Sequence, residues 1–272
     1  MCLLVVLSRV VPGVPLVVGG NRDERLDRPA EAMAVLRDAG PQVLGGRDLK
    51  AGGTWLAVNE HGVVAGLTNR PLLGGPDATR RSRGDLPLAL TAHPSAQSAV
   101  AAFVREHRAG DYNPAWLLVG DREVLLSVEM AGEGDIVVTE LPPGVHVLEN
   151  RALGIESGKV DLVRSKLAGI ESRPVDEVVA RLEGVLGDHE IPDEPPPEEP
   201  PPPPPPEPGE EPAPPRVRLP EVRAACVHTE EFGTRWSGLV TVPADPSARP
   251  GFRFADGHPC TTPFEDASAR WD

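Results

Sequence analysis

The residues with the clearest capacity for chemistry stand at the start of the chain, where Met1 is followed by Cys2. A small second residue permits removal of Met1, and Cys2 would then carry a free α-amino group beside its thiol. An α-amine titrates near pH ~7.7 to 8.0 and a free cysteine near ~8.5, so one residue can supply a nucleophile and its base close to neutral pH. Position alone favours a plainer interpretation, a cysteine buried in the core.

A charged segment is expected to lie beside Cys2. Two apolar runs, Leu3 to Val11 and Leu16 to Val18, flank a turn at Pro12 and Gly13, and this pattern predicts an N-terminal hairpin. The second strand leads into a polar group made of Asn21, Arg22, Asp23 and Glu24. Because a hairpin aligns its two ends, we expect this group to lie next to Cys2.

The polar group offers a carboxylate and a guanidinium to the cysteine. Asp23 can orient an ammonium group, and Arg22 can hold a thiolate or a substrate carboxylate. Two glycines, Gly19 and Gly20, precede the group, so a charged turn is an interpretation of equal weight.

Apolar spacing along the rest of the chain predicts strands and helices in alternating blocks. The predicted strands are Trp55 to Val58, Val63 to Leu67, Trp116 to Val119, Glu123 to Val128, Ile136 to Leu141, His146 to Leu148, and further strands within 222–254. The predicted helices are Leu86 to His93, Ala96 to His107 with Ser95 as N-cap, Val160 to Ile170 and Val175 to Leu186. The first strand is apolar without alternation, which implies burial on both faces. This order predicts an α+β fold in which sheets pack between helical layers.

Residues 192–220 interrupt this pattern with sixteen of the 33 prolines. The stretch lacks apolar side chains and most backbone donors, which predicts a proline- and glutamate-rich disordered insertion or an extended spacer. The remaining residues, 1–191 and 221–272, then form a single domain. An SH3-like or WW-like partner for the proline run is the weaker alternative.

The composition argues against several classes of function. The formal charge is −14, and half of it lies in residues 192–215, which hold no basic residue. A nucleic-acid partner needs clustered Lys and Arg, and a membrane span needs an apolar run of ~20 residues, so we expect neither. Three unpaired cysteines (Cys2, Cys226 and Cys260) and seven scattered histidines indicate no disulfide, metal site or cofactor, and a cytoplasmic location is expected.

Several motifs together resemble the NRDE family, also called the Transport and Golgi Organization family. The matching residues are Met1 and Cys2, Asn21 to Glu24, Gly52 to Leu56, Leu67 to Asn69, Arg83 to Leu86, Leu148 to Asn150, and Phe232 to Arg235. The resemblance covers nearly the whole chain outside the proline-rich insertion. It implies a four-layer αββα sandwich like that of N-terminal-nucleophile hydrolases, among them the choloylglycine hydrolases and penicillin V acylases.

The same resemblance implies roles for individual residues. Cys2 would be the nucleophile, Asp23 the partner of its amine, and Asn69 and Asn150 the donors to the oxyanion, with Arg22 beside them. Gly53, Thr54 and Trp55, together with Asn21 and Glu24, are predicted to contact the substrate; for the Gly53 to Trp55 stretch, a glycine-rich turn into a buried strand is equally compatible.

One departure concerns arginine. The acylases carry an arginine before the Asn-x-Asp stretch, where this chain has Gly20, and Arg22 lies inside the stretch instead. Arg22 is therefore expected to point the other way. The acylases also use a later arginine, for which Arg164 is the sequence's candidate.

Two functions follow from these residues. The first is an amidohydrolase-like protein in which Cys2 attacks an amide or ester of a small molecule and water releases the acyl group. The alternative is a carrier or trafficking factor for haem or another apolar, lipid-like ligand, built on the same fold without turnover.

Overall fold

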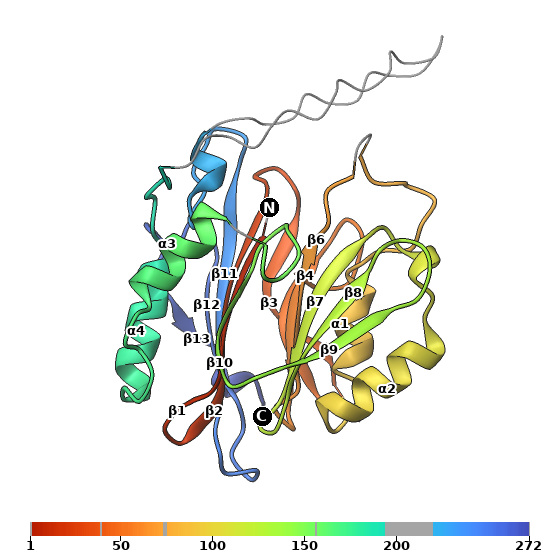
Figure 1. Ribbon diagram of the computed structural model, residues 1–272, viewed down its shortest axis with the longest axis horizontal. Coiled ribbons are helices and arrows are strands. Elements are labelled where there is room, and N and C mark those ends of the chain that lie inside the picture. Colours follow the sequence, from red (N-terminus) through yellow and green to blue (C-terminus); the bar gives the residue numbers. More distant parts are fainter. Residues whose placement is uncertain (1, 39, 73–74, 156, 194–219, 272) are drawn as a thin grey trace.

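The computed structural model describes residues 2–38, 40–72, 75–155, 157–193 and 220–271. Two antiparallel sheets lie face to face, and two α-helices cover the outer side of each (Figure 1). The first sheet contains, in spatial order, β10 (Gly144–Leu148), β1 (Cys2–Val11), β2 (Val14–Arg25), β11 (Phe232–Val242), β12 (Gly251–Ala255) and β13 (Glu265–Asp266). The second contains β3 (Ala30–Arg37), β4 (Val43–Asp48), β5 (Leu56–Asn59), β6 (Val64–Asn69), β7 (Ala115–Gly120), β8 (Leu125–Met130) and β9 (Val137–Leu141).

The helices complete a four-layer αββα sandwich. α3 (Gly158–Lys166) and α4 (Val175–Leu186) cover the first sheet, and α1 (Asp85–Leu90) and α2 (Ala96–Glu106) cover the second. Short 3-10 turns occur at Ala109–Asp111, Pro220–Arg223 and Ser268–Trp271. The predicted α+β class and layer order are therefore confirmed.

The first strand, β1, is central to this architecture because both of its faces are buried. Leu4 and Val6 point into the core between the two sheets, whereas Leu3 and Val5 pack under α3 and α4. The continuous apolar run of β1 therefore reflects burial on both faces of the strand, as the sequence predicted. β10 and β2 pair with β1 on its two edges, so the strand that carries Cys2 is held on both sides.

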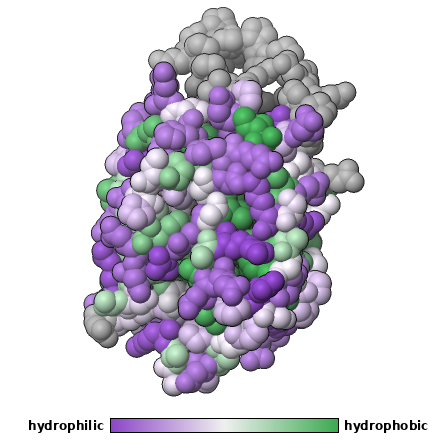
Figure 2. All heavy atoms as spheres, turned by 90° about the vertical axis from the view of Figure 1, so that its left-hand side faces the viewer, coloured by the Kyte–Doolittle hydropathy of each residue, from purple (hydrophilic) through white to green (hydrophobic). Residues whose placement is uncertain are grey.

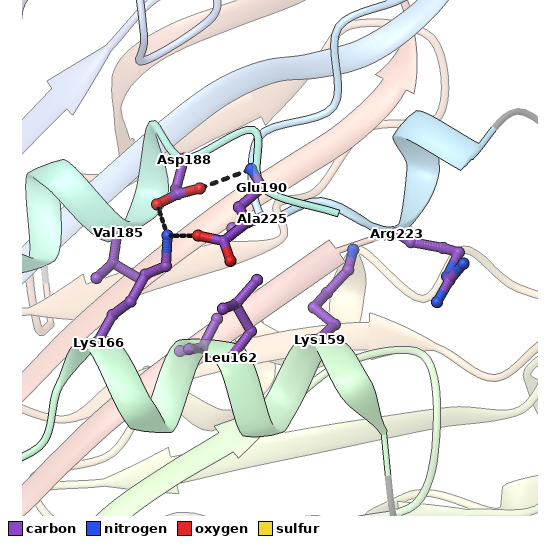
Figure 3. A pocket seen from close by; sticks show the side chains of 9 residues that line it. Lys159, Leu162, Lys166, Val185, Asp188, Glu190, Arg223 and Ala225 are labelled. Carbon is purple, nitrogen blue, oxygen red and sulfur yellow. Dashed lines mark hydrogen bonds and ion pairs between the residues drawn. The ribbon is translucent and has the colours of Figure 1, made fainter. Parts of the chain in front are cut away.

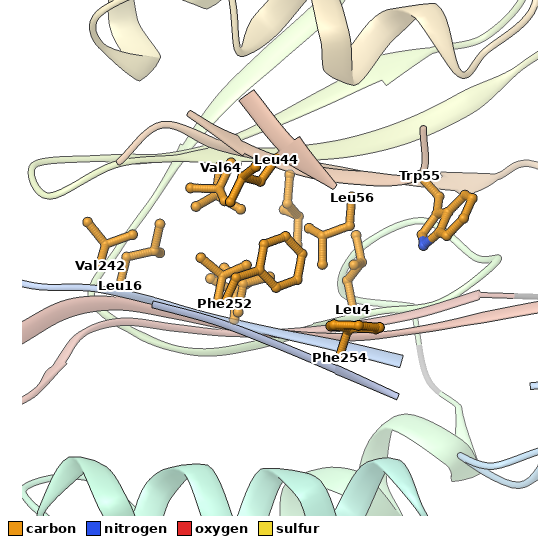
Figure 4. Packing of buried hydrophobic residues seen from close by; sticks show 14 of the residues in the cluster. Leu4, Leu16, Leu44, Trp55, Leu56, Val64, Val242, Phe252 and Phe254 are labelled. Atoms are coloured by element: carbon orange, nitrogen blue, oxygen red, sulfur yellow. The ribbon is translucent and has the colours of Figure 1, made fainter. Parts of the chain in front are cut away.

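The core between the sheets is packed closely around Leu4, which is 3% exposed (Figure 4). A Cβ added at Gly20 would lie 2.8 Å from Leu4, and one at Gly66 would lie 2.9 Å from it. These glycines, one in each sheet, leave the space that the leucine fills. Leu56 and Phe252 contribute to the same cluster.

The outer helices are amphipathic. In α4, Val178, Leu182 and Leu186 are buried against the first sheet. The outward side is mostly hydrophilic, with small apolar patches between polar side chains (Figure 2). At the N-terminus of α2, the Ser95 side chain accepts the backbone N–H of Ser98, and the Ser98 side chain accepts that of Ser95, so the predicted N-cap is part of a capping box.

Two strands, β3 and β4, lie in a region where the sequence indicated none. β3 is rich in alanine, and β4 contains Gly45 and Gly46, and both features obscure a strand pattern. Packing explains the glycines, since a Cβ at Gly46 would overlap the ring of Trp55. β2 also runs on to Arg25, so the polar group is part of a strand rather than a turn.

Most of the predicted proline-rich insertion, residues 194–219, lies outside the described residues, and its role stays a prediction. Its last residue, Pro220, begins a 3-10 turn. No helix among the described residues has both the length and the apolar character needed to cross a membrane.

Replacing Leu4 by alanine should reduce the free energy of unfolding by about 2–5 kcal/mol, because the two flanking glycines cannot fill the cavity. Leu49, which is 57% exposed, is the matched control, and Leu49→Ala should change that free energy by no more than about 0.5 kcal/mol. Denaturant titration of both variants measures the difference. Equal losses would contradict the proposed role of Leu4 in the core.

Candidate active site

Cys2 lies at the end of β1, where the two sheets approach each other, and it is 9% exposed. Its backbone nitrogen donates a hydrogen bond of 2.7 Å to Oδ1 of Asn150. The Nδ2 group of Asn150 donates in turn to the backbone oxygen of Asn69, at the end of β6 in the other sheet. Asn150 therefore ties the first strand of one sheet to the second sheet at the position of the cysteine.

The groups around the thiol of Cys2 shift its pKa in opposite directions. Burial raises the pKa of Cys2 above its ordinary value, and the charge of Asp23 raises it further. The guanidinium of Arg22 and a hydrogen bond from the Asp23 backbone act in the opposite direction. The net direction is upward, so this thiol needs a base before it can act as a nucleophile at neutral pH.

Arg22 lies directly opposite Cys2 in the β1–β2 pair and points between the sheets. Its Nη2 donates to Oδ2 of Asp48 at 3.2 Å, and its guanidinium carbon lies 4.4 Å from the ring centroid of Trp55. Nη1 is buried with no hydrogen-bond partner among the described residues. Burial also lowers the pKa of Arg22.

The expected reversal of the arginine side chain was wrong. Gly20 and Arg22 are two residues apart on one strand, so they share a face, and a Cβ at Gly20 would meet Leu4 and Leu56 between the sheets. Arg22 is thus displaced along the strand and keeps the same direction.

Asp23 points to the other face of the first sheet, toward α3. It is 5% exposed, and its Oδ1 accepts a 2.6 Å hydrogen bond from the hydroxyl of Thr234. Burial raises the pKa of this carboxyl, and the positive charge of Lys159 partly offsets the effect. The side chain lies one residue from the strand position opposite Cys2, and its role as partner of the amine stays a prediction.

Asn21 has a structural environment instead of the predicted substrate contact. Its Nδ2 donates to the carbonyls of Leu186 and Ala225 at 2.9 and 2.8 Å, and its Oδ1 accepts from the hydroxyl of Ser237. Both amide hydrogens are used inside the protein, on the face away from Arg22. Asn21 therefore fixes α4 and the segment before β11 to the first sheet.

Gly53 and Thr54 hold a neighbouring turn rather than facing a ligand. Gly53 has a φ of +76°, and a Cβ there would lie 2.7 Å from the Cα of Gly84. The Thr54 N–H donates to the Gly84 carbonyl at 3.0 Å. This contact seats the turn that carries Arg83.

Arg83 is a residue of the site that the sequence did not single out. Its side chain interacts electrostatically with Cys2, and its Nη1 donates to the carbonyl of Pro114 at 3.3 Å. Burial lowers its pKa. The Arg83 motif was among the family matches, which was the available signal. Arg164, the sequence's candidate for a second arginine, is exposed on α3, so that assignment was wrong.

The remaining predicted residues have clear positions. Trp55 is buried, packs edge-on against Trp236 at 5.2 Å between centroids, and acts on the site through the ring face that it presents to Arg22. Glu24 lies on the same face as Arg22, with its Oε2 3.7 Å from Nη2 of that residue. Asn69 is exposed at the end of β6 and contributes its backbone carbonyl to Asn150.

A small, partly open pocket lies outside this site, between α3 and the segment that follows α4 (Figure 3). Lys166 bridges Asp188 and Glu190 at its edge, and Lys159 and Arg223 line it. Its lining includes neither Cys2 nor either arginine of the site.

The fold is similar to that of N-terminal-nucleophile hydrolases. One similar solved structure is a mutant conjugated bile acid hydrolase from Clostridium perfringens, with a TM-score of 0.56 and 12% identity, covering 99% of this chain and 93% of that chain. Another is the Caenorhabditis elegans ortholog of N-acylethanolamine-hydrolyzing acid amidase, with a TM-score of 0.53 and 14% identity, covering 91% and 94%. At such identities the likeness concerns the fold.

The chain belongs to the Transport and Golgi organisation 2 family, whose profile matches residues 1–249. It is 31% identical over 247 residues to the Transport and Golgi organization protein 2 homolog of Bos taurus, covering 85% of this chain and 83% of that protein. The resemblance inferred from the motifs is confirmed.

Gly53→Ala should raise the apparent pKa of Cys2, because displacement of the Gly84 turn moves the positive charge of Arg83 away from the thiolate. Arg83→Ala should give the same upward shift. The rate of alkylation of Cys2, followed by peptide mapping as a function of pH, measures it. Gly52→Ala is the matched control, since Gly52 also has a positive φ but no atom within 4 Å of the added Cβ. A folded Gly53→Ala protein with the wild-type profile would contradict this role.

Asp23→Asn should become more stable relative to the wild type as the pH rises. The pKa of Asp23 in the folded protein lies above its ordinary value of 3.8. Above about pH 4, therefore, the unfolded chain loses the Asp23 proton while the folded protein still holds it. The free energy of unfolding of the wild type falls as the pH rises, until the folded carboxyl also ionises. Asp245→Asn is a control of opposite sign, because hydrogen bonds from Ser247 lower the pKa of Asp245. Denaturant titrations across the pH range test both, and parallel curves for Asp23→Asn and wild type would refute the prediction.

Proposed function

We propose that the protein is an N-terminal-nucleophile hydrolase that cleaves an amide or ester bond of a small molecule through Cys2. The observation that carries the proposal is the placement of Cys2 at the end of a buried central strand, with its nitrogen bonded to Asn150 and Arg22 directly opposite. A terminus held in this way keeps a thiol and an amine in a fixed relation, which acyl transfer requires.

The proposed reaction begins when Met1 has been removed. The α-amine of Cys2 accepts the thiol proton, and the thiolate forms a bond to the substrate carbonyl carbon. The leaving amine or alcohol takes the proton as the acyl–nitrogen or acyl–oxygen bond breaks. Water then attacks the thioester, the amine again accepting a proton, and the acid product leaves with the thiol restored.

Stabilisation of the oxyanion falls to two asparagines. One hydrogen of the Asn150 amide is donated to Asn69, and a primary amide carries a second. The exposed Asn69 side chain is the other proposed donor. Each donor of this type contributes roughly 2.7–4 kcal/mol to transition-state stabilisation. Asn150 would also hold the amine in place through its oxygen, so one side chain serves both the base and the oxyanion.

The charge around Cys2 suggests the substrate class. Arg22 has a buried Nη1 with no hydrogen-bond partner among the described residues, and Arg83 also interacts with the cysteine. A buried guanidinium directly opposite the nucleophile favours a substrate with a carboxylate or a similar anionic group close to the scissile bond. The names of the two fold neighbours, a conjugated bile acid hydrolase and an N-acylethanolamine-hydrolyzing amidase, support an amide bond as the target.

Incubation of the mature protein with an activated acyl ester or a β-lactam should give a covalent adduct on Cys2, detected by intact mass and peptide mapping. Cys2→Ser should lose at least about 100-fold in adduct formation, because the hydroxyl is a weaker nucleophile. A chain with an uncleavable N-terminal extension should lose it as well, since the extension blocks the amine.

N-terminal sequencing of the same sample establishes whether Met1 is absent. No adduct on a protein that begins at Cys2 would overturn the proposal. If Cys2→Ser then retained cellular function in full, the carrier role for haem or another apolar ligand would be favoured instead.

A further inference from the structure

Three side chains with metal-binding atoms meet at a place remote in sequence from the candidate active site. They are His189, Cys226 and Cys260, and their ligand atoms lie within 4.8 Å of one another. Cys226 is fully buried, whereas His189 and Cys260 are exposed. Two thiols and an imidazole are the donor types that zinc prefers.

The three residues come from three separate segments that backbone contacts hold together. His189 follows α4, Cys226 lies between the turn Pro220–Arg223 and β11, and Cys260 follows β12. The Cys226 N–H donates to the carbonyl of Asp188 at 2.8 Å, and a Cβ at Gly187 would lie 3.4 Å from the Cα of Cys260. The segments after α4, before β11 and after β12 are therefore packed together, and they hold the three side chains at one place.

The imidazole of His189 is oriented by the same cluster. Its Nδ1 lies 3.0 Å from the backbone oxygen of Cys226, and a carbonyl only accepts, so Nδ1 carries the hydrogen. In the neutral ring the Nε2 lone pair is then available. A hydrogen bond from one ring nitrogen to a backbone carbonyl is the usual support of a histidine that binds metal through the other.

The two thiols also contact each other. Their sulfur atoms lie within 4.8 Å of each other. Zinc binds cysteine as the thiolate, so binding of the ion releases the thiol protons.

We propose that His189, Cys226 and Cys260 bind one Zn²⁺ ion, with a solvent molecule in the fourth position. Tetrahedral zinc with bonds of ~2.3 Å to sulfur and ~2.0–2.1 Å to nitrogen places its ligand atoms roughly 3.3–3.8 Å apart. Contraction from 4.8 Å requires about 1 Å of movement, which rotation of the two exposed side chains supplies. The exposure of both leaves access for the ion and for the solvent ligand.

This site is distinct from the one at Cys2. It lies on the helical side of the first sheet, where Val227 and Thr234 connect it to Asp23 through hydrogen bonds of 2.8 and 2.6 Å. Cys2 and Arg22 belong to the side between the sheets. Sequence spacing indicated no metal site, and the donors come together only through the fold.

A disulfide between the two cysteines is the competing use of this cluster. Formation of a disulfide needs an oxidant. It would also use only the two cysteines, so it would not explain why His189 is oriented by the Cys226 carbonyl. Zinc uses all three and needs no change of oxidation state.

Co²⁺ titration of the reduced, metal-free full chain tests the proposal. The expected result is a near-ultraviolet thiolate-to-cobalt absorption band that saturates at one ion per chain and disappears on addition of one equivalent of Zn²⁺. Zn²⁺ should also raise the Tm of the wild type.

Single substitutions distinguish metal binding at this site from metal binding by other cysteines and histidines of the chain. Cys260→Ser and His189→Gln, both at exposed positions, should weaken Zn²⁺ binding by about 100-fold or more, since loss of an outer-shell partner alone costs ~10–100-fold. Cys2→Ser and His61→Gln should bind as the wild type does. His61 is an exposed histidine far from the cluster.

Two outcomes would overturn the proposal. One is the absence of a thiolate band and of a Tm shift in reduced, folded wild-type protein. The other is an intact mass two hydrogens lower under mild reductant, mapped to a Cys226–Cys260 disulfide that excludes the metal. Neither outcome bears on the reaction at Cys2, which the adduct experiment tests separately.

Discussion

The antiparallel pairing of β1 with β2 is the constraint on which the candidate site depends. It places Cys2 opposite Arg22, and the alternation of a strand then sends Arg22 between the sheets and Asp23 toward the helices. A slip of one residue would exchange these faces, putting the carboxylate in the apolar core and the guanidinium under α3. The cores on both sides of β1 fix the register, because Leu3 and Leu4 fill different layers.

Close backbone approach supplies the second arginine. Gly53 has no Cβ, so the turn at Gly84 can lie against it and bring Arg83 to the cysteine from a loop of the second sheet. Arg22 and Arg83 come from opposite sheets, and both carry pKa values lowered by burial. Burying two cations is unfavourable unless anions compensate them. Glu24 and Asp48 form ion pairs with Arg22, and the charge of Glu24 also favours the charged form of Arg83.

Local patterns predicted the parts of this protein that local forces determine. The apolar run of β1, the turn with Gly13 at a φ of +72°, and the Ser95 cap each depend on neighbouring residues, and each was recognisable. β4 was not, because its two glycines leave room for distant segments: a Cβ at Gly45 would overlap the Leu56 carbonyl, and one at Gly46 would overlap the ring of Trp55. The position of Arg83 and the meeting of His189 with two cysteines depend on contacts between distant segments, and sequence spacing carries no signal for those.

The first sheet carries different chemistry on its two faces. Between the sheets lie a thiol and a guanidinium, and on the helical face lie a carboxylate, a hydroxyl and a cluster of soft donors. Thr234 is paired with Asp23 in the sheet, and its side chain accepts the Val227 N–H while donating to the carboxylate. Because one hydroxyl hydrogen serves one acceptor, the donation to Asp23 fixes the orientation of Thr234 toward the segment that holds Cys226. The segment that holds Cys226 is therefore linked to the Asp23 carboxylate through this single hydroxyl.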